Sequence, residues 1–233
     1  MPWITVDEPF AKPPRVVEVS QKPEWAPPLS VDRGWAELSG VTVSGDPALD
    51  LGDCQELTIE DSALTGIAVG GEGSSISVEI YRSHLDGCDL SGRSIRNVRG
   101  TRLTACKMIG TDFAGGVIAD TIFERCVLRY ANLRMAKLSR VQFVDCSFDE
   151  VDCYQMEAAD VSFPGSTLVA VGLDSLNANR FDLREANEIT LSAITRLEGC
   201  LVSEHQLAGM AHSLAMAAGI QVEREIDDQD LDQ

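Results

Sequence analysis

Large apolar residues recur at every fifth position through the middle of this 233-residue chain. An α-helix repeats near 3.6 residues and a β-strand near 2, so neither element alone explains a period of five. A chain that makes a quarter turn every five residues does explain it, because each side of the coil then directs one apolar residue inward. Four sides would close one square coil. The eighteen positions are Val98, Leu103, Met108, Phe113, Ile118, Phe123, Leu128, Leu133, Leu138, Phe143, Phe148, Cys153, Ala158, Phe163, Leu168, Leu173, Ala178 and Leu183.

The residue two positions before each apolar centre is often small, which predicts one large and one small inward side chain on each side of the coil. Four earlier residues, Ile80, Leu85, Leu90 and Ile95, keep the same spacing in a frame offset by three. The small residues are Ser83, Cys88, Thr101, Cys106, Thr111, Gly116, Thr121, Cys126, Ala131, Ala136, Cys146 and Ser166.

A short repeat of fixed period is typical of a solenoid. Here the motifs CDLSG, TDFAG and ANLRM, each with a small residue, then Asp or Asn, then Leu or Phe, resemble the pentapeptide-repeat family. The resemblance covers about residues 80 to 188 closely and 37 to 79 loosely. It implies an all-β solenoid, specifically a right-handed quadrilateral β-helix.

Residues twenty apart should stack as neighbours in such a coil, about 4.8 Å from each other. This predicts a column of Phe123, Phe143 and Phe163, and a column of thiols. The thiol column comprises Cys88, Cys106, Cys126 and Cys146. A metal or redox site is one interpretation, but stacked thiols that point the same way offer no tetrahedral ligand set. Structural packing at the small inward position is the preferred interpretation.

The formal net charge of −18 argues against direct nucleic-acid binding, which depends on Lys and Arg contacts to phosphates. The same stacking rule predicts cross-coil ion pairs, so that the basic residues of the middle coils are neutralised. The predicted pairs are Arg125 with Asp145, Arg129 with Asp149, Lys137 with Glu157 and Arg140 with Asp160, the last within a column of alternating sign, Asp120, Arg140, Asp160 and Arg180.

Unpaired acid gathers toward both ends of the repeat region. Residues 37 to 79 hold nine acidic and no basic residues, and residues 146 to 233 hold seventeen acidic against four basic. We therefore expect an acidic surface that attracts basic partners. The candidate residues of this surface are Asp149, Glu150, Asp152, Asp174, Asp182 and Glu185.

Composition divides the chain into four segments. Residues 1–36 contain seven of the nine prolines and all three tryptophans, and are expected to form an arm that is either pinned to the body by its aromatic residues or a free linker. Residues 37–200 form the β-helix, regular from about 80 to 188. Residues 201–222 form a C-terminal cap, and residues 223–233 an acidic tail.

The segment SEHQLAGMAHSLAMAAGIQV breaks the five-residue rule and predicts a C-terminal capping α-helix. Ser203 and Gln206 have the spacing of a capping box, and Gly219 is a natural stop. Its sides are apolar nearly all round, so one side should cover the open end of the coil and the other should form a homodimer interface. A cap covered by the arm is the alternative. The predicted interface residues are Leu207, Met210, Ala211, Leu214, Ala215 and Ala218.

No known catalytic motif is present, so an enzyme is not expected, and neither is a cofactor or a metal. His84 should point outward, and His205 and His212 lie seven apart, without the spacing of a zinc-binding pair. The glycine-rich stretch GGEGSS at 70 to 75 lacks the Lys of a phosphate-binding loop and is expected to be a turn or projecting loop. Seven cysteines without a C-x-x-C pair, and no long apolar run, indicate a cytoplasmic protein with no membrane contact.

The resemblance implies a non-enzymatic protein that acts by protein–protein interaction. The best-understood members of the family are acidic dimers that mimic duplex DNA, bind DNA gyrase and protect it from fluoroquinolones or peptide toxins, which makes topoisomerase inhibition and antibiotic resistance the leading expectation. An immunity role against a toxin is not separable from it. The alternative is a rigid adaptor or scaffold that binds a partner unrelated to DNA through its arm or loops.

Overall fold

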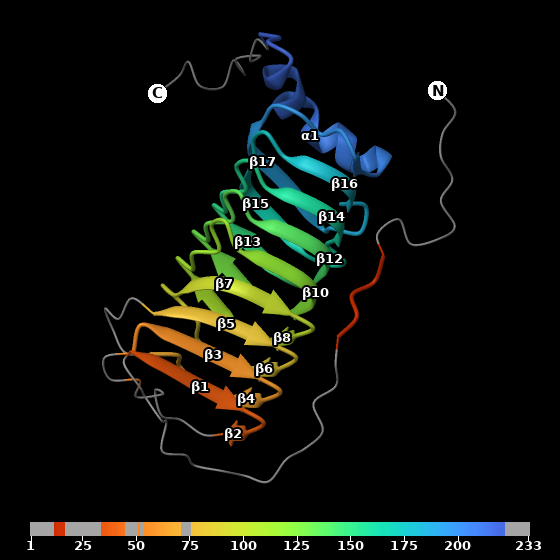
Figure 1. The fold of residues 1–233 in the computed structure, drawn as a ribbon. Coiled ribbons are helices and arrows are strands. Elements are labelled where there is room, and N and C mark those ends of the chain that lie inside the picture. Colours follow the sequence, from red (N-terminus) through yellow and green to blue (C-terminus); the bar gives the residue numbers. More distant parts are fainter. Residues whose placement is uncertain (1–11, 17–33, 45–50, 52–53, 71–75, 222–233) are drawn as a thin grey trace, which may run out of the picture.

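A computed structural model describes residues 12–16, 34–44, 51, 54–70 and 76–221. They form a β-solenoid of about eight turns that ends in one helix, with β1 at one end of the rod and α1 at the other (Figure 1). The predicted fold class, a right-handed quadrilateral β-helix with a C-terminal helix, is confirmed. Within the described residues, no helix is long and apolar enough to cross a membrane.

Four parallel ladders run along the rod, one for each side of the coil. The first face carries the path β1-β3-β5-β7-β10-β12-β14-β16, and the second face carries β2, β4, β6 and β8 and continues through the later halves of the long strands to β18. The strands of these two faces are β1 (Trp35–Ser39), β2 (Thr42–Ser44), β3 (Glu56–Glu60), β4 (Ala63–Thr65), β5 (Ser77–Tyr81), β6 (His84–Asp86), β7 (Ser94–Arg99), β8 (Arg102–Thr104), β10 (Val117–Glu124), β12 (Lys137–Val144), β14 (Glu157–Ser162), β16 (Asn177–Asp182) and β18 (Cys200–Leu201).

The third face is a separate five-stranded parallel sheet, and the fourth face is a row of single bridges that includes Asp112, Asn132, Asp152 and Gly172. Because every ladder is parallel, each coil lies directly on the one before it. The strands of the third face are β9 (Lys107–Ile109), β11 (Val127–Arg129), β13 (Ser147–Asp149), β15 (Thr167–Leu173) and β17 (Glu188–Ile194).

The four corners of each coil fall on residues in the left-handed region of φ. Every fifth residue from Gly100 to Arg180 has a φ between +51° and +66°, so a corner recurs once per repeat. The first and second faces meet at the column that contains Asp120 and Arg140. The third and fourth faces meet, diagonally opposite, at the column that contains Tyr130 and Glu150.

The inward positions predicted from the repeat fill the interior of the rod. Seventeen of the eighteen apolar positions are buried, and Ala178 is half-buried, while Ile80, Leu85, Leu90 and Ile95 and all twelve small positions are buried. Burial of apolar surface is the main stabilising contribution in such a rod. Each coil buries this surface against its two neighbouring coils only.

The coil length departs from twenty residues at the N-terminal end. Trp35 pairs with Glu56, which lies 21 positions later, and Glu56 pairs with Ser77 at the same spacing. The next coil is short, because Val78 pairs with Ile95 and a register shift follows. This short coil accounts for the three-residue offset between the two apolar frames. The first strand also starts at Trp35, two residues before the predicted start of the β-helix at residue 37.

Both predicted side-chain columns are present. The rings of Phe123 and Phe143 stack at 4.8 Å between centroids, and those of Phe143 and Phe163 at 5.3 Å. Phe181 extends this column against Phe163 at 5.0 Å. In the second column, Cys88, Cys106, Cys126 and Cys146 are all buried and unoxidised, and the backbone N–H of Cys126 donates to the Cys146 Sγ at 3.4 Å.

The rod ends in α1 (Glu204–Ala217), which packs against β17. Ser203 is its N-cap and forms the expected capping box with Gln206. The Gln206 amide also donates to the carbonyl oxygens of Leu183, Arg184 and Ala186, at 2.6 to 3.1 Å. These are carbonyls of the last regular coil, so the helix start satisfies part of the open edge of the rod.

Candidate functional site

An open groove of about 590 Å3 lies on the third and fourth faces, around the corner that contains Glu150 and Ala170. It spans the coils from β11 to β17. The outward residues of the earlier coils, such as Arg134 and Tyr154, are large, whereas those of the later coils, such as Ala170 and Gly172, are small. The groove therefore forms where the outward side chains become smaller along the rod. The lining residues are Arg134, Asp149, Glu150, Val151, Asp152, Tyr154, Val169, Ala170, Gly172, Asp174, Ser192 and Ala193.

Two of the four carboxylates in this groove are compensated by arginines. The Arg129 Nε lies 2.8 Å from the Asp149 Oδ2, and the Arg134 Nη1 lies 2.8 Å from the Asp152 Oδ2. The Arg134 guanidinium also sits 4.5 Å from the centre of the Tyr154 ring, which holds this wall of the groove in place.

The other two carboxylates, Glu150 and Asp174, have no ion-pair partner within the described part of the chain. Glu150 is exposed and Asp174 is half-buried. Carboxylates attract cations over roughly a Debye length, about 8 Å at physiological salt. The groove therefore has the chemistry of a contact for Lys or Arg side chains.

The six acids expected to form one surface are separated in the structure. Asp149, Glu150, Asp152 and Asp174 line the groove. Asp182 is only 9% exposed and accepts a hydrogen bond from the Arg184 Nη2 at 2.7 Å, so it offers no free charge to a partner. Glu185 is exposed but does not line the groove. The guanidinium of its neighbour Arg184 folds back over this carboxylate, which distinguishes Asp182 from the four acids of the groove.

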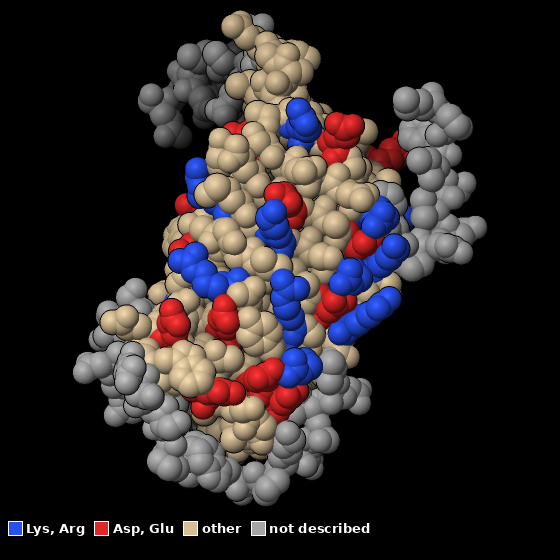
Figure 2. Space-filling view, in the orientation of Figure 1, with Lys and Arg blue, Asp and Glu red and all other residues tan. Residues whose placement is uncertain are grey.

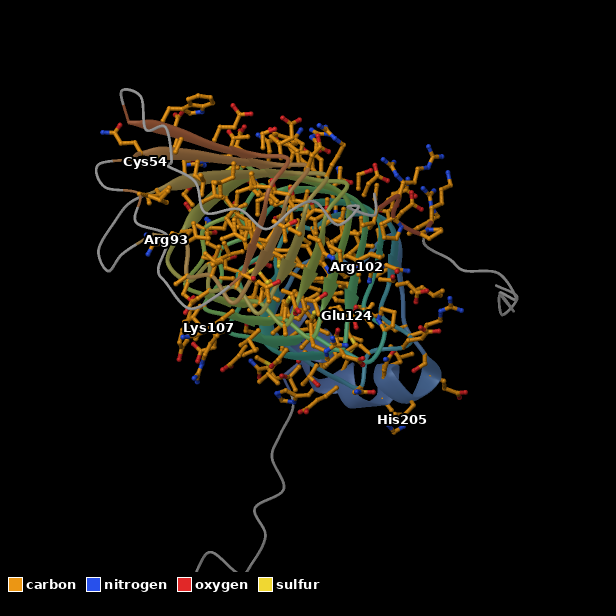
Figure 3. All side chains as sticks on the ribbon, turned by 90° about the horizontal axis from the view of Figure 1, so that it is seen from below. Cys54, Arg93, Arg102, Lys107, Glu124 and His205 are labelled. Atoms are coloured by element: carbon orange, nitrogen blue, oxygen red, sulfur yellow. The ribbon has the colours of Figure 1, made fainter. Side chains whose placement is uncertain are left out.

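The predicted cross-coil ion pairs are present in part. Arg129–Asp149 forms, and Lys137–Glu157 forms at 3.2 Å. Arg125 instead pairs with the adjacent Glu124, and Arg140 pairs with Asp120 at 2.6 Å in place of Asp160. Glu124 also pairs with Arg102 at 3.2 Å, and Figure 3 shows these two side chains together.

The six apolar residues assigned to the interface do not share one side of α1. Met210 is buried and Leu214 is partly buried against the rod, whereas Leu207, Ala211 and Ala218 are exposed and Ala215 is half-buried. Leu207 and Met216 keep 48% and 58% of their surface exposed. One stripe of the helix therefore closes the rod, and the other is an open apolar surface.

The histidines lie apart from the groove. His84, His205 and His212 are exposed, and Figure 3 shows His205 on the outer side of α1. Among the residues that the structure describes, no group of three or more His, Cys, Asp or Glu side chains is arranged to hold a metal ion. Within the glycine-rich stretch, residues 71–75 lie outside the described residues, as do the acidic tail from 222 onward and the arm residues Trp3 and Trp25.

Sequence comparison matches residues 100–173 to the family model of the pentapeptide repeat region. This segment is the most regular part of the rod, with a corner at every fifth residue. Residues 100–173 are therefore a pentapeptide-repeat region. Among curated proteins, none has detectable sequence similarity to the chain.

Comparison with solved structures also finds proteins similar to this chain. A trypsin-treated variant of QnrB1, a plasmid-mediated fluoroquinolone resistance protein, has 16% identity and a TM-score of 0.28 over 81% of this chain and 99% of its own. HetL of Nostoc sp. strain PCC 7120, involved in heterocyst differentiation regulation, has 16% identity and a TM-score of 0.26 over 72% of this chain and 87% of its own.

Rfr23 of the cyanobacterium Cyanothece 51142, another pentapeptide repeat protein, has 11% identity and a TM-score of 0.22 over 44% of this chain and 61% of its own. Similarity at these levels does not transfer the activity of a neighbour to this chain.

Sequence reasoning named the four acids of the groove but not the groove itself. The signal was present in the outward residues of the segment VAVGLDS at 169 to 175, which are small, beside the larger Arg134 and Tyr154 of the preceding coils. A search of outward positions for size, in addition to charge, would have found it.

Proposed function

We propose that this pentapeptide-repeat protein acts without catalysis, as a rigid rod that binds a basic surface of another protein in its acidic groove, and that DNA gyrase or a related type II topoisomerase is that partner. The observation that carries the proposal is the pair of carboxylates, Glu150 and Asp174, that have no ion-pair partner within the described residues of an open groove. A protein that binds DNA presents basic surface, which such carboxylates would engage as phosphates do.

The distribution of charge favours a partner contact that is limited to the groove. It gives less support to a rod that mimics DNA along its whole length. Residues 80 to 145 hold eleven basic and six acidic residues. Figure 2 shows Lys and Arg interspersed with Asp and Glu over the first face. Ion pairs such as Lys137–Glu157 neutralise much of this face, so the excess of acid that a basic partner would recognise lies in the groove.

The test is a gyrase supercoiling assay with increasing amounts of the full chain, with and without a fluoroquinolone. We expect inhibition, or rescue from the drug, that is lost in the variant Glu150→Lys/Asp174→Lys. The matched control is Asp86→Lys/Glu198→Lys, which makes the same change in net charge at exposed residues outside the groove and should behave like the wild type. No effect of the wild-type protein would overturn the choice of partner. Equal effects of the two variants would overturn the role of the groove.

We further propose that the exposed stripe of α1 is the interface of a homodimer, as the family resemblance implies. The support is an apolar surface that includes Leu207 and Met216 at the end of the rod. Sedimentation at micromolar concentration should give a dimer for the wild type and a monomer for Leu207→Asp. His205→Asp, an equivalent change at an exposed polar residue of the same helix, should leave the dimer intact. A monomeric wild type would exclude this interface.

A rigid adaptor is the second candidate. It is favoured by the hydrogen bonds that hold residues 12–16 against the rod, from the backbone of Lys12 and Arg15 to Asp160 and Asp120. An arm held at a fixed place can present a second binding element. In that case the supercoiling assay gives no effect, and capture experiments with the full chain and with Glu150→Lys/Asp174→Lys recover the same partner.

A further inference from the structure

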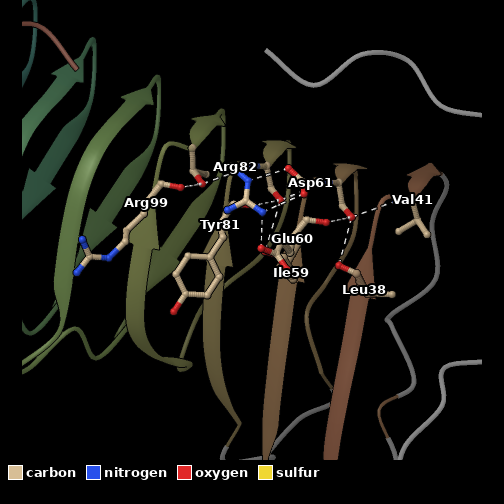
Figure 4. A network of polar contacts seen from close by, with 11 residues as sticks. Leu38, Val41, Ile59, Glu60, Asp61, Tyr81, Arg82 and Arg99 are labelled. Carbon is tan, nitrogen blue, oxygen red and sulfur yellow. Dashed lines mark hydrogen bonds and ion pairs between the residues drawn. The ribbon is translucent and has the colours of Figure 1, made fainter. Parts of the chain in front are cut away.

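The corner between the first and second faces carries a column of Asp–Arg pairs that repeats every two or three coils. Asp61 pairs with Arg82 at 2.9 Å, Asp120 with Arg140 at 2.6 Å, and Asp160 with Arg180. In each pair the Asp lies on one coil and the Arg on the next, and all have left-handed φ values. Figure 4 shows the first of these pairs, with Arg82 between Glu60 and Asp61.

Two aspartates of this column also accept hydrogen bonds from the N-terminal arm. The backbone N–H of Lys12 donates to the Asp160 Oδ1 at 2.9 Å, and the backbone N–H of Arg15 donates to the Asp120 Oδ1 at 3.2 Å. These contacts join positions 148 and 105 residues apart in the chain. Figure 1 shows the described arm segment alongside the edge of the rod near β12 and β10.

The arm residues between these contacts are Pro13 and Pro14. Proline has no N–H, so the Lys-Pro-Pro-Arg segment has two backbone donors in total, and the column accepts both. A polyproline II helix has three residues per turn, so donors three residues apart point to the same side.

The spacing of the donors matches the spacing of the aspartates. Three residues of polyproline II rise about 9.3 Å, at roughly 3.1 Å each. Asp120 and Asp160 lie on β-coils two apart, which is about 9.6 Å at roughly 4.8 Å per coil. The agreement follows from two backbone geometries, so any extended segment with the same arrangement of donors and prolines would fit the column.

Charge adds to this fit. The side chains of Lys12 and Arg15 are cations, and each residue also donates its backbone N–H to one aspartate. Asp160, the acceptor for Lys12, is only 4% exposed. The hydrogen bonds from Arg180 are the main reason why the pKa of Asp160 lies below its ordinary value, and the Lys12 contact lowers it further. Both aspartates are therefore ionised acceptors at neutral pH, and hydrogen bonds to ionised acceptors are the stronger kind.

We propose that Asp120 and Asp160 form a binding site for an extended basic segment with the pattern Lys-Pro-Pro-Arg, and that residues 12–16 of the chain occupy this site as an internal ligand. A segment of the same chemistry on another molecule binds only when it displaces the arm. Tethering to the same chain raises the effective concentration of the arm at the site, which disfavours binding of a weak external peptide.

The test uses the full chain and a fluorescent peptide with the sequence of residues 10–17, FAKPPRVV, read out by anisotropy. The variant Lys12→Pro/Arg15→Pro removes both backbone donors, keeps the extended conformation and leaves the rod unchanged, so its site is open. We expect the peptide to bind this variant at least tenfold more tightly than the wild type. Lys12→Ala/Arg15→Ala removes the same two cations but keeps both donors, and should stay closer to the wild type.

Two further controls separate the site from charge attraction. A peptide with a third proline, FAKPPPRVV, keeps the charge but breaks the donor spacing and should lose the binding. Adding Asp120→Asn/Asp160→Asn to the open variant should also abolish it, while Arg140→Gln/Arg180→Gln, which breaks the same ion pairs but keeps the carboxylates, should not. Equal binding to the wild type and the open variant, no binding to either, or equal binding of the two peptides would overturn the proposal.

Discussion

The backbone N–H of Lys12 lies 2.9 Å from the carboxylate of Asp160, which is also the partner of Arg180 on the next coil. One buried aspartate thus joins the N-terminal arm to the C-terminal half of the rod. In a solenoid each coil contacts only its neighbours, so such a contact couples parts of the molecule that the ladder alone leaves independent.

The aspartates of this column make stability depend on pH. Hydrogen bonds from Arg140 lower the pKa of Asp120 below its ordinary value, and those from Arg180 do the same for Asp160. A pKa that is lower in the folded state stabilises the fold above the unfolded-state value, near pH 4, and this contribution is lost as the pH falls through the folded-state values. We expect the free energy of unfolding, from urea titrations, to fall below about pH 4.

The variant Asp120→Asn/Asp160→Asn should be less stable than the wild type at neutral pH and should lose less stability on acidification. Asp86→Asn, at an exposed carboxylate of β6, should keep the wild-type dependence. An equal loss between neutral and acid pH in all three proteins would contradict the assignment to the two aspartates.

The phenylalanine column predicts a large effect at one residue. Phe143 stacks on Phe123 and Phe163 and meets the edge of Phe148 at 5.0 Å between ring centroids. Phe143→Ala should lower the free energy of unfolding by about 3–5 kcal/mol, since it leaves a cavity between three rings. Tyr130→Ala, at a ring that is 51% exposed, should cost less than about 1 kcal/mol. Similar losses in chemical denaturation would show that the column is not the centre of the core.

The thiol column predicts a preference for small side chains. The Cys146 Sγ lies 3.4 Å from the carbonyl oxygens of Phe123 and Val144, and Ser166, one coil later, donates from its hydroxyl to the Phe143 carbonyl at 2.8 Å. A serine at position 146 would therefore find acceptors already in place, and Cys146→Ser should cost less than about 1.5 kcal/mol. Cys146→Leu overfills the interior and should cost about 1–3 kcal/mol. Thermal unfolding would rank the two, and the reverse order would contradict this account.

The inward residues were predictable because burial imposes one requirement on all of them. Each position must be apolar or small, and this requirement recurs in the sequence at a fixed spacing from Val98 to Leu183. The partner of an outward charge is a different problem. Arg140 lies twenty residues from both Asp120 and Asp160, so the spacing cannot decide between them, and the structure selects Asp120. Arg125 takes its sequence neighbour Glu124.

Two features leave no trace in the periodicity of the inward residues. The arm is anchored by the backbone of Lys12 and Arg15, and a backbone N–H is present at almost every residue, so side-chain patterns do not reveal it. The groove depends on the loss of outward side-chain size at Ala170 and Gly172, whereas periodicity was evaluated for inward positions. Both are surface features, and function depends on the surface more than on the repeat.

The corners of the coil predict a substitution that increases stability. Ala105 occupies an exposed corner with φ of +51°, a conformation that costs an L-residue roughly 1–2 kcal/mol. Ala105→Gly removes this cost, and the greater chain entropy of glycine in the unfolded state, about 0.5–1 kcal/mol, offsets only part of the gain. We expect a net stabilisation of about 0.5–1 kcal/mol in urea unfolding.

The same exchange at Ala211, exposed in α1, should instead destabilise by about 1 kcal/mol, because that residue has ordinary helical geometry. Opposite signs for one chemical change would identify the left-handed corner as a strained element of the repeat, and a loss of stability in both variants would show that the corner carries no such strain.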